Sequence, residues 1–283
     1  MINIQWFPGY MSKTFKNIKN NLKLVDFILI ILDARIPFSS MNFELLKFLN
    51  NKPFLILLNK SYLADLEQNS FFLNFFYKKK IFYTLNIDAK QKININKIYP
   101  KITEILKSQN QKIKKFLKLM IVGVPNVGKS TLINCLAGKK VTKTANLPGV
   151  TKHMQWINLD NNMKLLDTPG VLWPKFSYKE IGYSLAICGC IKENLFIDKE
   201  IVDYLFKYLK ENYPKSIKKL FNLNDAELKQ DNLLQVLKNK IYNNDSNFFD
   251  FEQEKNLSSI ILKKVRSKKM PKINYDLNFR TFL

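Results

Sequence analysis

Short apolar runs alternate with helical patterns along the first 170 residues of the chain. Runs of four to eight residues rich in Ile, Leu, Val and Phe predict strands buried in a sheet. Alternation of such runs with helices is typical of parallel β/α units. The sequence therefore predicts an α/β fold with one doubly wound, mostly parallel, six-stranded sheet. The predicted strands are Val25–Leu32, Phe54–Leu58, Ile81–Leu85, Leu117–Val122, Gln155–Leu159 and Met163–Leu166.

Helical spacing alone continues after residue 178, which predicts two domains, residues 1–178 with the sheet and residues 179–283 as a smaller all-helical domain. Apolar residues recur at helical spacing from Ile201 to Leu209 and from Leu233 to Leu237. A last apolar stripe consists of Leu257, Ile260, Ile261 and Val265. A similar stripe at the other end of the chain, Met11, Phe15, Ile18, Leu22 and Val25, predicts a helix that packs on the core.

A glycine-rich turn follows the fourth predicted strand and leads into an apolar helical pattern. Its spacing, Gly-x-x-x-x-Gly-Lys-Ser from Gly123 to Ser130, is that of a loop whose backbone N–H groups surround phosphate oxygens. The Lys129 ammonium adds a formal positive charge for the β- and γ-phosphates. The predicted nucleotide-binding residues here are Asn126, Val127, Gly128, Lys129, Ser130 and Thr131.

Two later segments complete a predicted magnesium site. Asp167-Thr168-Pro169-Gly170 follows the sixth strand, where Asp167 is expected to hold Mg²⁺ through water and the Gly170 amide to face a γ-phosphate. Between this segment and the phosphate loop, Pro148-Gly149-Val150-Thr151 offers the Thr151 hydroxyl. Ser130, Thr151 and Asp167 are the predicted Mg²⁺ ligands, because hydroxyl and carboxylate oxygens suit this cation.

The loops after the second and third strands are the candidate base-binding loops. Asn59 and Lys60 follow the second strand and are expected to pack against a base and its ribose. Asp88 and Ala89 follow the third, where a backbone amide is expected to contact the base. Carboxyl ends of parallel strands share one edge of a sheet, which is where ligands of this fold class bind.

A formal net charge of +23 narrows the choice of partners. Residues 1–178 carry 27 Lys and Arg against 9 Asp and Glu, whereas residues 179–283 carry 19 against 14. Codon bias accounts for Lys in place of Arg but not for the scarcity of acids, so nucleic acid is favoured over charge drift or an anionic membrane surface.

Other residue counts exclude several classes of protein. Three cysteines do not make a disulfide framework, and we expect them to be small buried residues in a reducing compartment. His153 is the only histidine, which rules out histidine triads and multi-histidine metal sites. No apolar run is long enough for a bilayer span, and residues 1–10 show no secretion or transit signal. We expect a cytoplasmic protein, with an organelle matrix as the alternative, and no membrane partner.

The order of these motifs, with both base loops before the phosphate loop, resembles that of the circularly permuted ribosome-assembly GTPases, specifically the RbgA (YlqF) family. Trp6-Phe7-Pro8-Gly9-Tyr10-Met11 and Leu32-Asp33-Ala34-Arg35-Ile36-Pro37 are similar to motifs of that family. The likeness continues through Pro169–Phe176 to Gly182 and Gly189, and so covers the chain from about Trp6 to about Leu195.

The resemblance implies a permuted P-loop GTPase that hydrolyses GTP with Mg²⁺ and K⁺. It also implies a protein that helps to assemble the large ribosomal subunit by binding the rRNA of its precursor in a nucleotide-dependent way. No heptad pattern or exposed apolar seam demands a dimer, so we expect a monomer. By the same resemblance Asn126 is the K⁺ ligand, and Lys129, Thr151, Gly170 and Tyr10 are the catalytic residues. Val171 stands where many other GTPases carry a glutamine that positions water, and valine has no group to do so.

Two positions depart from the family pattern. Tyr62 stands where the family's Asn-Lys-x-Asp motif has an aspartate that accepts hydrogen bonds from guanine. Asp65 lies one helical turn further on and is a candidate substitute only if that turn is rewound. Tyr10 stands where the family has a histidine associated with hydrolysis, and His153 is a possible replacement. Two alternatives therefore remain open: an rRNA-binding module with a slow or structural nucleotide site, and a P-loop ATPase that acts on RNA.

Lysines near both ends of the chain are the predicted RNA contacts. Some alternate with the apolar stripe of the first helix, and others follow the last stripe, where a solvated tail is the alternative interpretation. Point charges of this kind predict steep salt dependence rather than strict base recognition. The predicted contacts are Lys13, Lys16, Lys263, Lys264, Arg266, Lys268 and Lys269.

Overall fold

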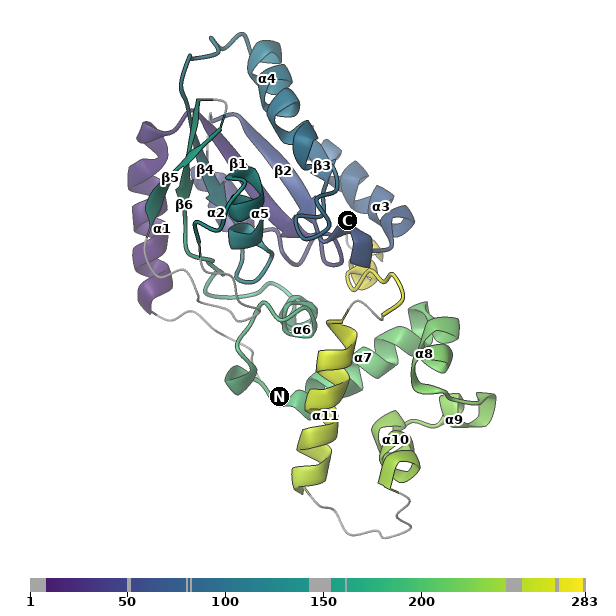
Figure 1. Cartoon of the computed structure of the whole chain (residues 1–283). Coiled ribbons are helices and arrows are strands. Elements are labelled where there is room, and N and C mark those ends of the chain that lie inside the picture. Colours follow the sequence, from purple (N-terminus) through teal and green to yellow (C-terminus); the bar gives the residue numbers. More distant parts are fainter. Residues whose placement is uncertain are drawn as a thin grey trace.

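A computed structural model describes residues 9–49, 52–79, 81, 83–142, 154–160, 162–242, 251–267 and 270–281. One six-stranded sheet with the strand order β3-β2-β1-β4-β6-β5 forms its centre (Figure 1). All neighbouring strands are parallel except β5 and β6, which are antiparallel. The strands are β1 (Phe27–Asp33), β2 (Phe54–Asn59), β3 (Thr84–Asn86), β4 (Leu117–Val122), β5 (Gln155–Leu159) and β6 (Met163–Asp167).

The predicted α/β class and all six strands are confirmed, with shifts at two strand starts. The first strand begins at Phe27 rather than Val25, because the Val25 amide donates to the Leu22 carbonyl oxygen (3.4 Å). The third begins at Thr84 rather than Ile81, because the Ile81 amide donates to Phe76 at the end of the preceding helix (2.9 Å).

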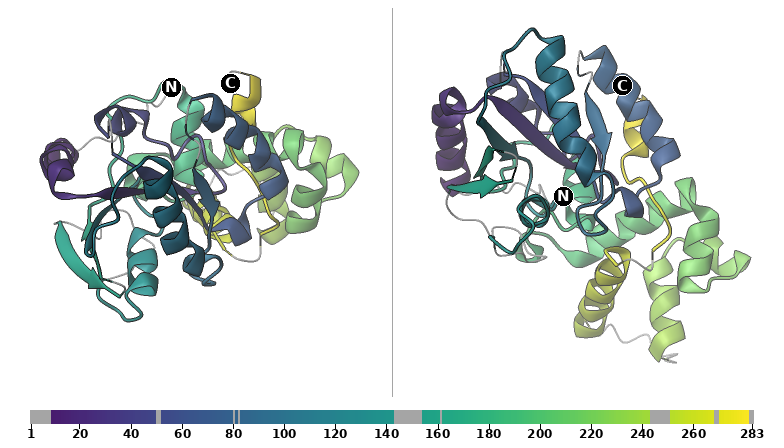
Figure 2. Two further views of the ribbon diagram at one scale, coloured as in Figure 1. Left: turned by 90° about the horizontal axis from the view of Figure 1, so that it is seen from above. Right: turned by 45° about the horizontal axis from the view of Figure 1, so that its top comes forward.

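The order of the strands places helices on both faces of the sheet. The chain moves from β1 outward to β2 and β3 and then crosses back to β4 on the other side of β1. Because parallel crossovers are right-handed, this reversal puts the helix before β4 on the face opposite the earlier ones. Helices α4 and α5 lie in front of the sheet in Figure 1, with α2 behind it, and Figure 2 shows the same arrangement from above. The helices of this part are α1 (Gly9–Asn21), α2 (Phe43–Phe48), α3 (Leu66–Lys78), α4 (Ile98–Ser108) and α5 (Lys129–Leu136).

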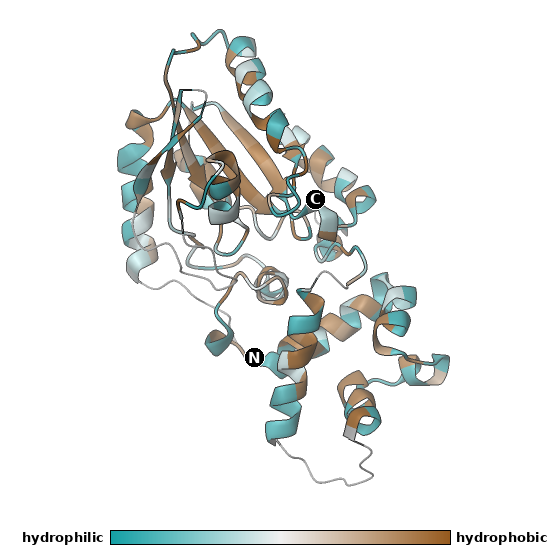
Figure 3. Ribbon diagram, viewed as in Figure 1, coloured by the Kyte–Doolittle hydropathy of each residue, from teal (hydrophilic) through white to brown (hydrophobic). Residues whose placement is uncertain are grey.

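The core lies within the sheet and between the sheet and its helices. All seven residues of β1 are buried, which is expected of a central parallel strand covered on both faces. Figure 3 shows the strands as the most hydrophobic part of the molecule. Cys188 and Cys190 are buried as expected, whereas Cys135 is half-buried. None of the described helices is long and apolar enough to cross a membrane.

The rest of the chain is helical, and its main elements surround α7. Six residues of α7 are buried, among them Leu205 and Leu209 of the predicted stripe. In the apolar stripe of the last helix, Leu257, Ile261 and Val265 are buried, whereas Ile260 is 56% exposed. The helices of this part are α6 (Lys179–Ile187), α7 (Asp198–Asn212), α8 (Pro214–Phe221), α9 (Asp225–Lys229), α10 (Leu233–Tyr242) and α11 (Phe251–Val265).

After α11 the chain returns to the sheet, in yellow near α3 in Figure 1. The Tyr275 amide donates to the Arg35 carbonyl oxygen (2.7 Å), and the Tyr208 hydroxyl of α7 donates to the Asn274 carbonyl oxygen (2.6 Å). Buried Asp276 accepts hydrogen bonds from the amides of Phe38 and Ser39, both at 2.8 Å, and from the Ser39 hydroxyl. Residues 275 and 276 therefore pack on the sheet part, although the predicted boundary at residue 178 places them in the helical domain.

Replacing Asp276 by alanine is expected to lower the free energy of unfolding by about 2–4 kcal/mol, because the change leaves buried donors without an acceptor. Urea denaturation of the full chain measures this. Asp225→Ala is the matched control: Asp225 is exposed and pairs with Lys218 at the surface, so its removal should leave stability near the wild-type value. Equal stability of the two variants would contradict the structural role of Asp276.

Candidate nucleotide site

The phosphate loop has the predicted strand–turn–helix geometry. It follows β4 at Gly123 and ends at Gly128, and α5 begins at Lys129. Gly128 has φ = 98°, in the left-handed region that favours glycine. A Cβ atom there would lie 2.4 Å from Nδ2 of Asn59, so a side chain would also displace the amide group of Asn59. The backbone N–H groups at the start of α5 therefore lie beside a loop that only glycine allows, which is the arrangement that binds phosphate.

The Lys129 ammonium is held inside this loop. Its Nζ atom donates to the carbonyl oxygens of Gly123 (3.0 Å) and Val124 (2.9 Å). Burial lowers the pKa of Lys129 to about 8, and the charge of Asp167 opposes this shift only in part. A buried cation whose pKa is lowered is stabilised by any anion that enters the loop. A bound phosphate would therefore stabilise the charged form of Lys129.

Asp167 ends β6 and is fully buried beside this cation. Neither of its carboxylate oxygens accepts a hydrogen bond of normal geometry from the described residues. Burial raises the pKa of Asp167 to about 6, against the opposing effects of Lys129 and of the Thr168 amide. A buried carboxylate without donors is unstable unless a cation or water reaches it.

These residues fit a magnesium ion. Ser130 lies half-buried in the first turn of α5, and both carboxylate oxygens of Asp167 lack a partner among the described residues. In the same part of the chain no cluster of three or more acidic, cysteine or histidine side chains would hold a metal alone. Mg²⁺ bound by one hydroxyl, one carboxylate, water and phosphate oxygens needs no such cluster. Thr151, the third predicted ligand, lies outside the described residues, as does His153.

Gly170 lies directly against the phosphate loop. A Cβ atom there would be 2.6 Å from Cα of Pro125, so only glycine allows this approach. The Thr168 hydroxyl donates to the Ile121 carbonyl oxygen (2.7 Å), and the Val171 amide to that of Gly123 (3.3 Å). The structure thus brings the segment after β6 to the phosphate loop, as the sequence predicted.

Asn59 joins the base loop to the phosphate loop. Its Nδ2 atom donates to the Val127 carbonyl oxygen (2.7 Å), and its Oδ1 atom accepts from the Ala89 amide (2.9 Å). One side chain therefore connects three loops that are far apart in the sequence. The position of Asn59 after β2 distinguishes it from the other Asn-Lys pairs of the chain.

The loop after β3 is held by its own hydrogen bonds. Buried Asp88 accepts from the amides of Lys90 (3.0 Å) and Gln91 (2.8 Å). The Ala89 amide donates to Asn59. A contact between a backbone amide of this loop and a base stays a prediction.

A buried ion cluster that the sequence did not reveal lies at the end of β1. Asp33 is fully buried and accepts from Arg35 through both oxygens (3.0 and 2.7 Å) and from Lys60 (2.8 Å). Burial alone would raise the pKa of Asp33, but the charges of Arg35 and Lys60 hold it well below its usual range. Lys60 also donates to the Asn126 carbonyl oxygen (2.7 Å). The sequence shows an acidic residue at the end of an apolar strand. It does not show that Arg35 and Lys60 pair with this carboxylate.

Tyr62, Asp65 and Tyr10 differ in their surroundings. Tyr62 is 50% exposed. Asp65 caps α3 by accepting from the Gln68 amide (3.4 Å) and also accepts from the Tyr213 hydroxyl (3.2 Å). Tyr10 lies in the first turn of α1, and partial burial raises its pKa, so its phenolate form is even scarcer at neutral pH.

The predicted RNA contacts differ in their surroundings. Lys13 and Lys16 are exposed on α1, and Lys263 is exposed on α11. Lys264 is also exposed and donates to the Leu220 carbonyl oxygen (2.8 Å). Lys268 and Lys269 lie outside the described residues.

Arg266 has a structural role that the sequence did not indicate. Its guanidinium donates to the carbonyl oxygens of Ile187 (3.0 Å) and Ala186 (2.7 Å) at the end of α6, and it pairs with Glu193. Basic side chains near a helix C-terminus satisfy its last carbonyl groups in this way. Contact with phosphate would therefore compete with this cap.

A phosphate loop, a buried Asp-x-x-Gly segment and an Asn-Lys base loop at one edge of a parallel sheet define a P-loop nucleotide-binding protein. A sequence profile described as 50S ribosome-binding GTPase matches residues 118–264. The chain belongs to this family. It is 41% identical over 231 residues to Ribosome biogenesis GTPase A of Priestia megaterium, with 79% of this chain and 80% of the relative covered.

Other relatives agree. The chain is 34% identical to Ribosome biogenesis GTPase A of Bacillus cereus, with 96% and 93% of the two chains covered. It is 33% identical to Mitochondrial ribosome-associated GTPase 1 of Bos taurus, with 83% and 73% covered. The GDP-bound structure of TM YlqF has the same fold, with a TM-score of 0.62 and 23% identity over 92% of this chain and 98% of that one.

Replacing Asp167 by asparagine is expected to stabilise the protein in the absence of metal and nucleotide. The raised pKa means that the folded state binds a proton between about pH 4 and pH 6 that the unfolded state has lost, so wild-type stability falls as pH rises through this window. The asparagine variant has no such loss, because its side chain does not titrate. Its advantage should grow from near zero at pH 4 to about 1–3 kcal/mol above pH 6.

Urea denaturation at pH 4.5 and pH 7.5 in EDTA measures this difference. Added Mg²⁺ and GTP should then stabilise the wild type more than the variant, because only the wild type has the carboxylate. A variant less stable than the wild type at pH 7.5 in EDTA would contradict the assignment of Asp167 as an unpaired buried charge.

Proposed function

We propose that this chain binds GTP with Mg²⁺ and K⁺, hydrolyses it, and binds the rRNA of a large ribosomal subunit precursor while GTP is bound. It acts as a monomer in a cytoplasm or an organelle matrix. The observation that carries the proposal is the buried pair of opposite charges, Lys129 and Asp167, each incompletely satisfied at the phosphate loop. The names of the bacterial and mitochondrial relatives support the ribosomal part.

In this proposal the triphosphate replaces the loop carbonyl groups as the partner of Lys129. Mg²⁺, when bound, neutralises charge that develops on the phosphates, and Ser130, Thr151 and Asp167 would hold it. The Gly170 amide faces the γ-phosphate. Asn126 is the proposed K⁺ ligand through its side-chain oxygen, because its Nδ2 atom donates to the Gly189 carbonyl oxygen (3.0 Å).

The residue after Gly170 is not a glutamine that could position water. Val171 is fully buried and has no polar side-chain atom. Stabilisation of the transition state is therefore assigned to cations, to backbone amides and to groups that the ribosomal particle supplies. Tyr10 is retained as a hydrogen-bond donor to this site rather than as a base.

Lys129→Ala is expected to lower GTP turnover by at least about 100-fold, because it removes the buried cation aimed at the phosphates. Release of phosphate is measured with and without large-subunit precursor particles, in KCl and in NaCl. The wild type should be stimulated by particles and by K⁺. Lys139→Ala, which removes an exposed lysine beyond α5, is the matched control and should retain wild-type turnover.

Two other results would replace the proposal. Tight particle binding that is indifferent to nucleotide would support an rRNA-binding module with a structural nucleotide site. Faster turnover of ATP than of GTP would support an RNA-dependent ATPase.

Base selectivity is the part of the function in which this chain departs from its family. Guanine presents N–H donors that a carboxylate pairs with, and Tyr62 offers only a hydroxyl. Asp65, the candidate substitute, would have to give up its cap on α3 and its contact with Tyr213. We therefore propose that selectivity for guanine over adenine is weak.

Tyr62→Asp is expected to raise the ratio of GTP to ATP affinity by about 10- to 100-fold, since a restored charged acceptor contributes about 1.5–3 kcal/mol. Competition binding with a labelled nucleotide measures the ratio. Tyr62→Phe is the control, and it should leave the ratio unchanged. An unchanged ratio in Tyr62→Asp would mean that the loop after β2 does not contact the base.

A further inference from the structure

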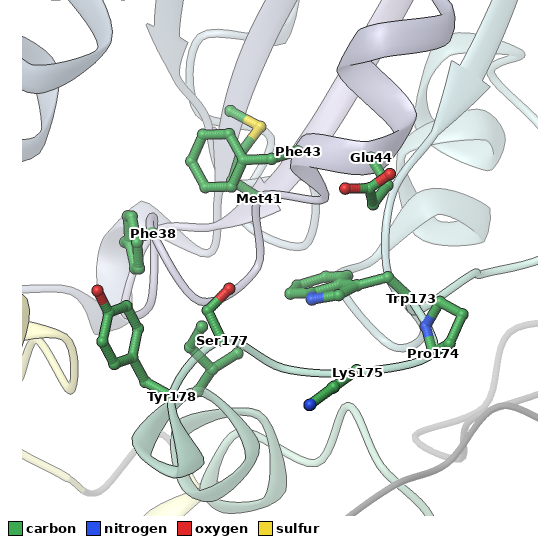
Figure 4. Close-up of a pocket in the computed structure, with 10 residues that line it drawn as sticks. Phe38, Met41, Phe43, Glu44, Trp173, Pro174, Lys175, Ser177 and Tyr178 are labelled. Atoms are coloured by element: carbon green, nitrogen blue, oxygen red, sulfur yellow. The ribbon is translucent and has the colours of Figure 1, made fainter.

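A cavity of about 360 Å³ opens beside α2, outside the phosphate loop (Figure 4). One wall comes from the β1–α2 loop and α2, and the other from the segment between Gly170 and α6. Its volume is at the lower end of the range for small-molecule pockets, about 300–1,000 Å³, so it suits a group the size of one nucleotide better than a helix or strand. Six of the lining residues provide aromatic faces, polar groups or a charge: Phe38, Phe43, Trp173, Lys175, Ser177 and Tyr178.

Four of the ten residues that line the cavity are aromatic, and neighbouring rings hold them in place. Phe38 packs against Phe43 (5.5 Å between ring centroids) and Phe279 (4.6 Å). Trp173 packs edge-on against Phe176 at 5.2 Å. Planar faces fixed in this way are the surfaces on which unstacked nucleobases stack. The indole N–H of Trp173 and the hydroxyl of Ser177 add polar groups that a base edge can use.

The charge around the cavity favours a polyanion. Lys175 lines the cavity and is exposed. Glu44, the one acid among the described lining residues, is paired with Lys47 (2.7 Å). Helix α1, with its exposed lysines, lies next to α2, because Phe15 contacts Phe48 (6.3 Å) and Lys19 lies over the Phe48 ring (5.5 Å).

From these observations we propose that the cavity binds one unstacked base of single-stranded RNA, with Lys175 on a flanking phosphate. The aromatic walls account for the base, and the surrounding lysines for the backbone. That this RNA is ribosomal rests on the proposed function, whereas the base-binding pocket itself does not.

Both walls of the cavity are attached to the nucleotide site. Trp173 follows Gly170 by three residues, and the Val171 amide between them donates to Gly123 in the phosphate loop (3.3 Å). On the other wall the chain leading to Phe38 begins at Ala34, whose amide donates to the Asn59 carbonyl oxygen (2.8 Å). A base in the cavity and a triphosphate in the loop therefore act on the same two segments. Such coupling is reciprocal, and the proposed function has RNA bound while GTP is bound, so each ligand should strengthen binding of the other.

The test uses the full chain and three labelled hexamers: oligouridylate, oligoadenylate and an abasic ribose-phosphate chain. Fluorescence anisotropy gives dissociation constants with and without a non-hydrolysable GTP analogue and Mg²⁺. The wild type should bind the base-bearing hexamers more tightly than the abasic one, by about 5- to 100-fold. The analogue should strengthen binding of the base-bearing hexamers only.

Trp173→Leu should remove this preference and leave binding of the abasic hexamer unchanged. The matched control is Trp156→Leu on β5, where the indole lies under Lys164 (5.7 Å) outside the cavity; it should behave as the wild type. Lys175→Gln should reduce the salt dependence of binding by about one unit of the log–log slope. Phe43→Leu, on the opposite wall, is a second variant that does not touch the segment after Gly170.

Equal binding of base-bearing and abasic hexamers by the wild type would overturn the proposal, and would favour an apolar protein side chain as the occupant. Unchanged base preference in both Trp173→Leu and Phe43→Leu would overturn it as well. GTP turnover is measured on the same preparations. Loss of turnover with base preference intact would contradict the proposed function alone, so the two failures are distinguishable.

Discussion

The arrangement of the site depends on the ion pairs that the buried Asp33 carboxylate makes. This carboxylate is fully buried at the end of β1 and receives Arg35 and Lys60, and Lys60 continues to the carbonyl of Asn126 in the phosphate loop. Buried charges contribute little net stability when paired, but removing one partner leaves the others uncompensated at a cost of about 3–5 kcal/mol. The cluster therefore connects the end of β1 with the loop after β2 and with the phosphate loop.

The phosphate loop shows the opposite condition. Lys129 and Asp167 are buried with too few partners. Burial lowers the pKa of Lys129 to about 8 and raises the pKa of Asp167 to about 6. A ligand with negative oxygens and a divalent cation would satisfy both. The protein thus combines a satisfied cluster that positions the loops with an unsatisfied pair that favours ligand binding, and the two are connected through Lys60, Asn126 and the turn at Gly128.

Connections from the site extend into the helical part through the last described residues. Asp276 holds the amides of Phe38 and Ser39, Tyr275 contacts the backbone of Arg35, and Tyr208 of α7 contacts Asn274. Arg266, after α11, caps α6. These hydrogen bonds connect the β1–α2 loop to α7 through residues 274–276.

The sequence by itself determined the strands, the phosphate loop and the order of the motifs, because these depend on local patterns: apolar runs, glycine spacing and the residues at strand ends. It also located Asn59 by position alone. Only the tertiary structure decided that Asp33 is a buried hub, that Arg266 caps a helix, that Ile260 faces solvent and that residues 273–279 return to the sheet. These outcomes depend on partners distant in the sequence, such as Lys60 for Asp33 and Ile187 for Arg266, and a local pattern carries no information about which distant group satisfies a buried charge.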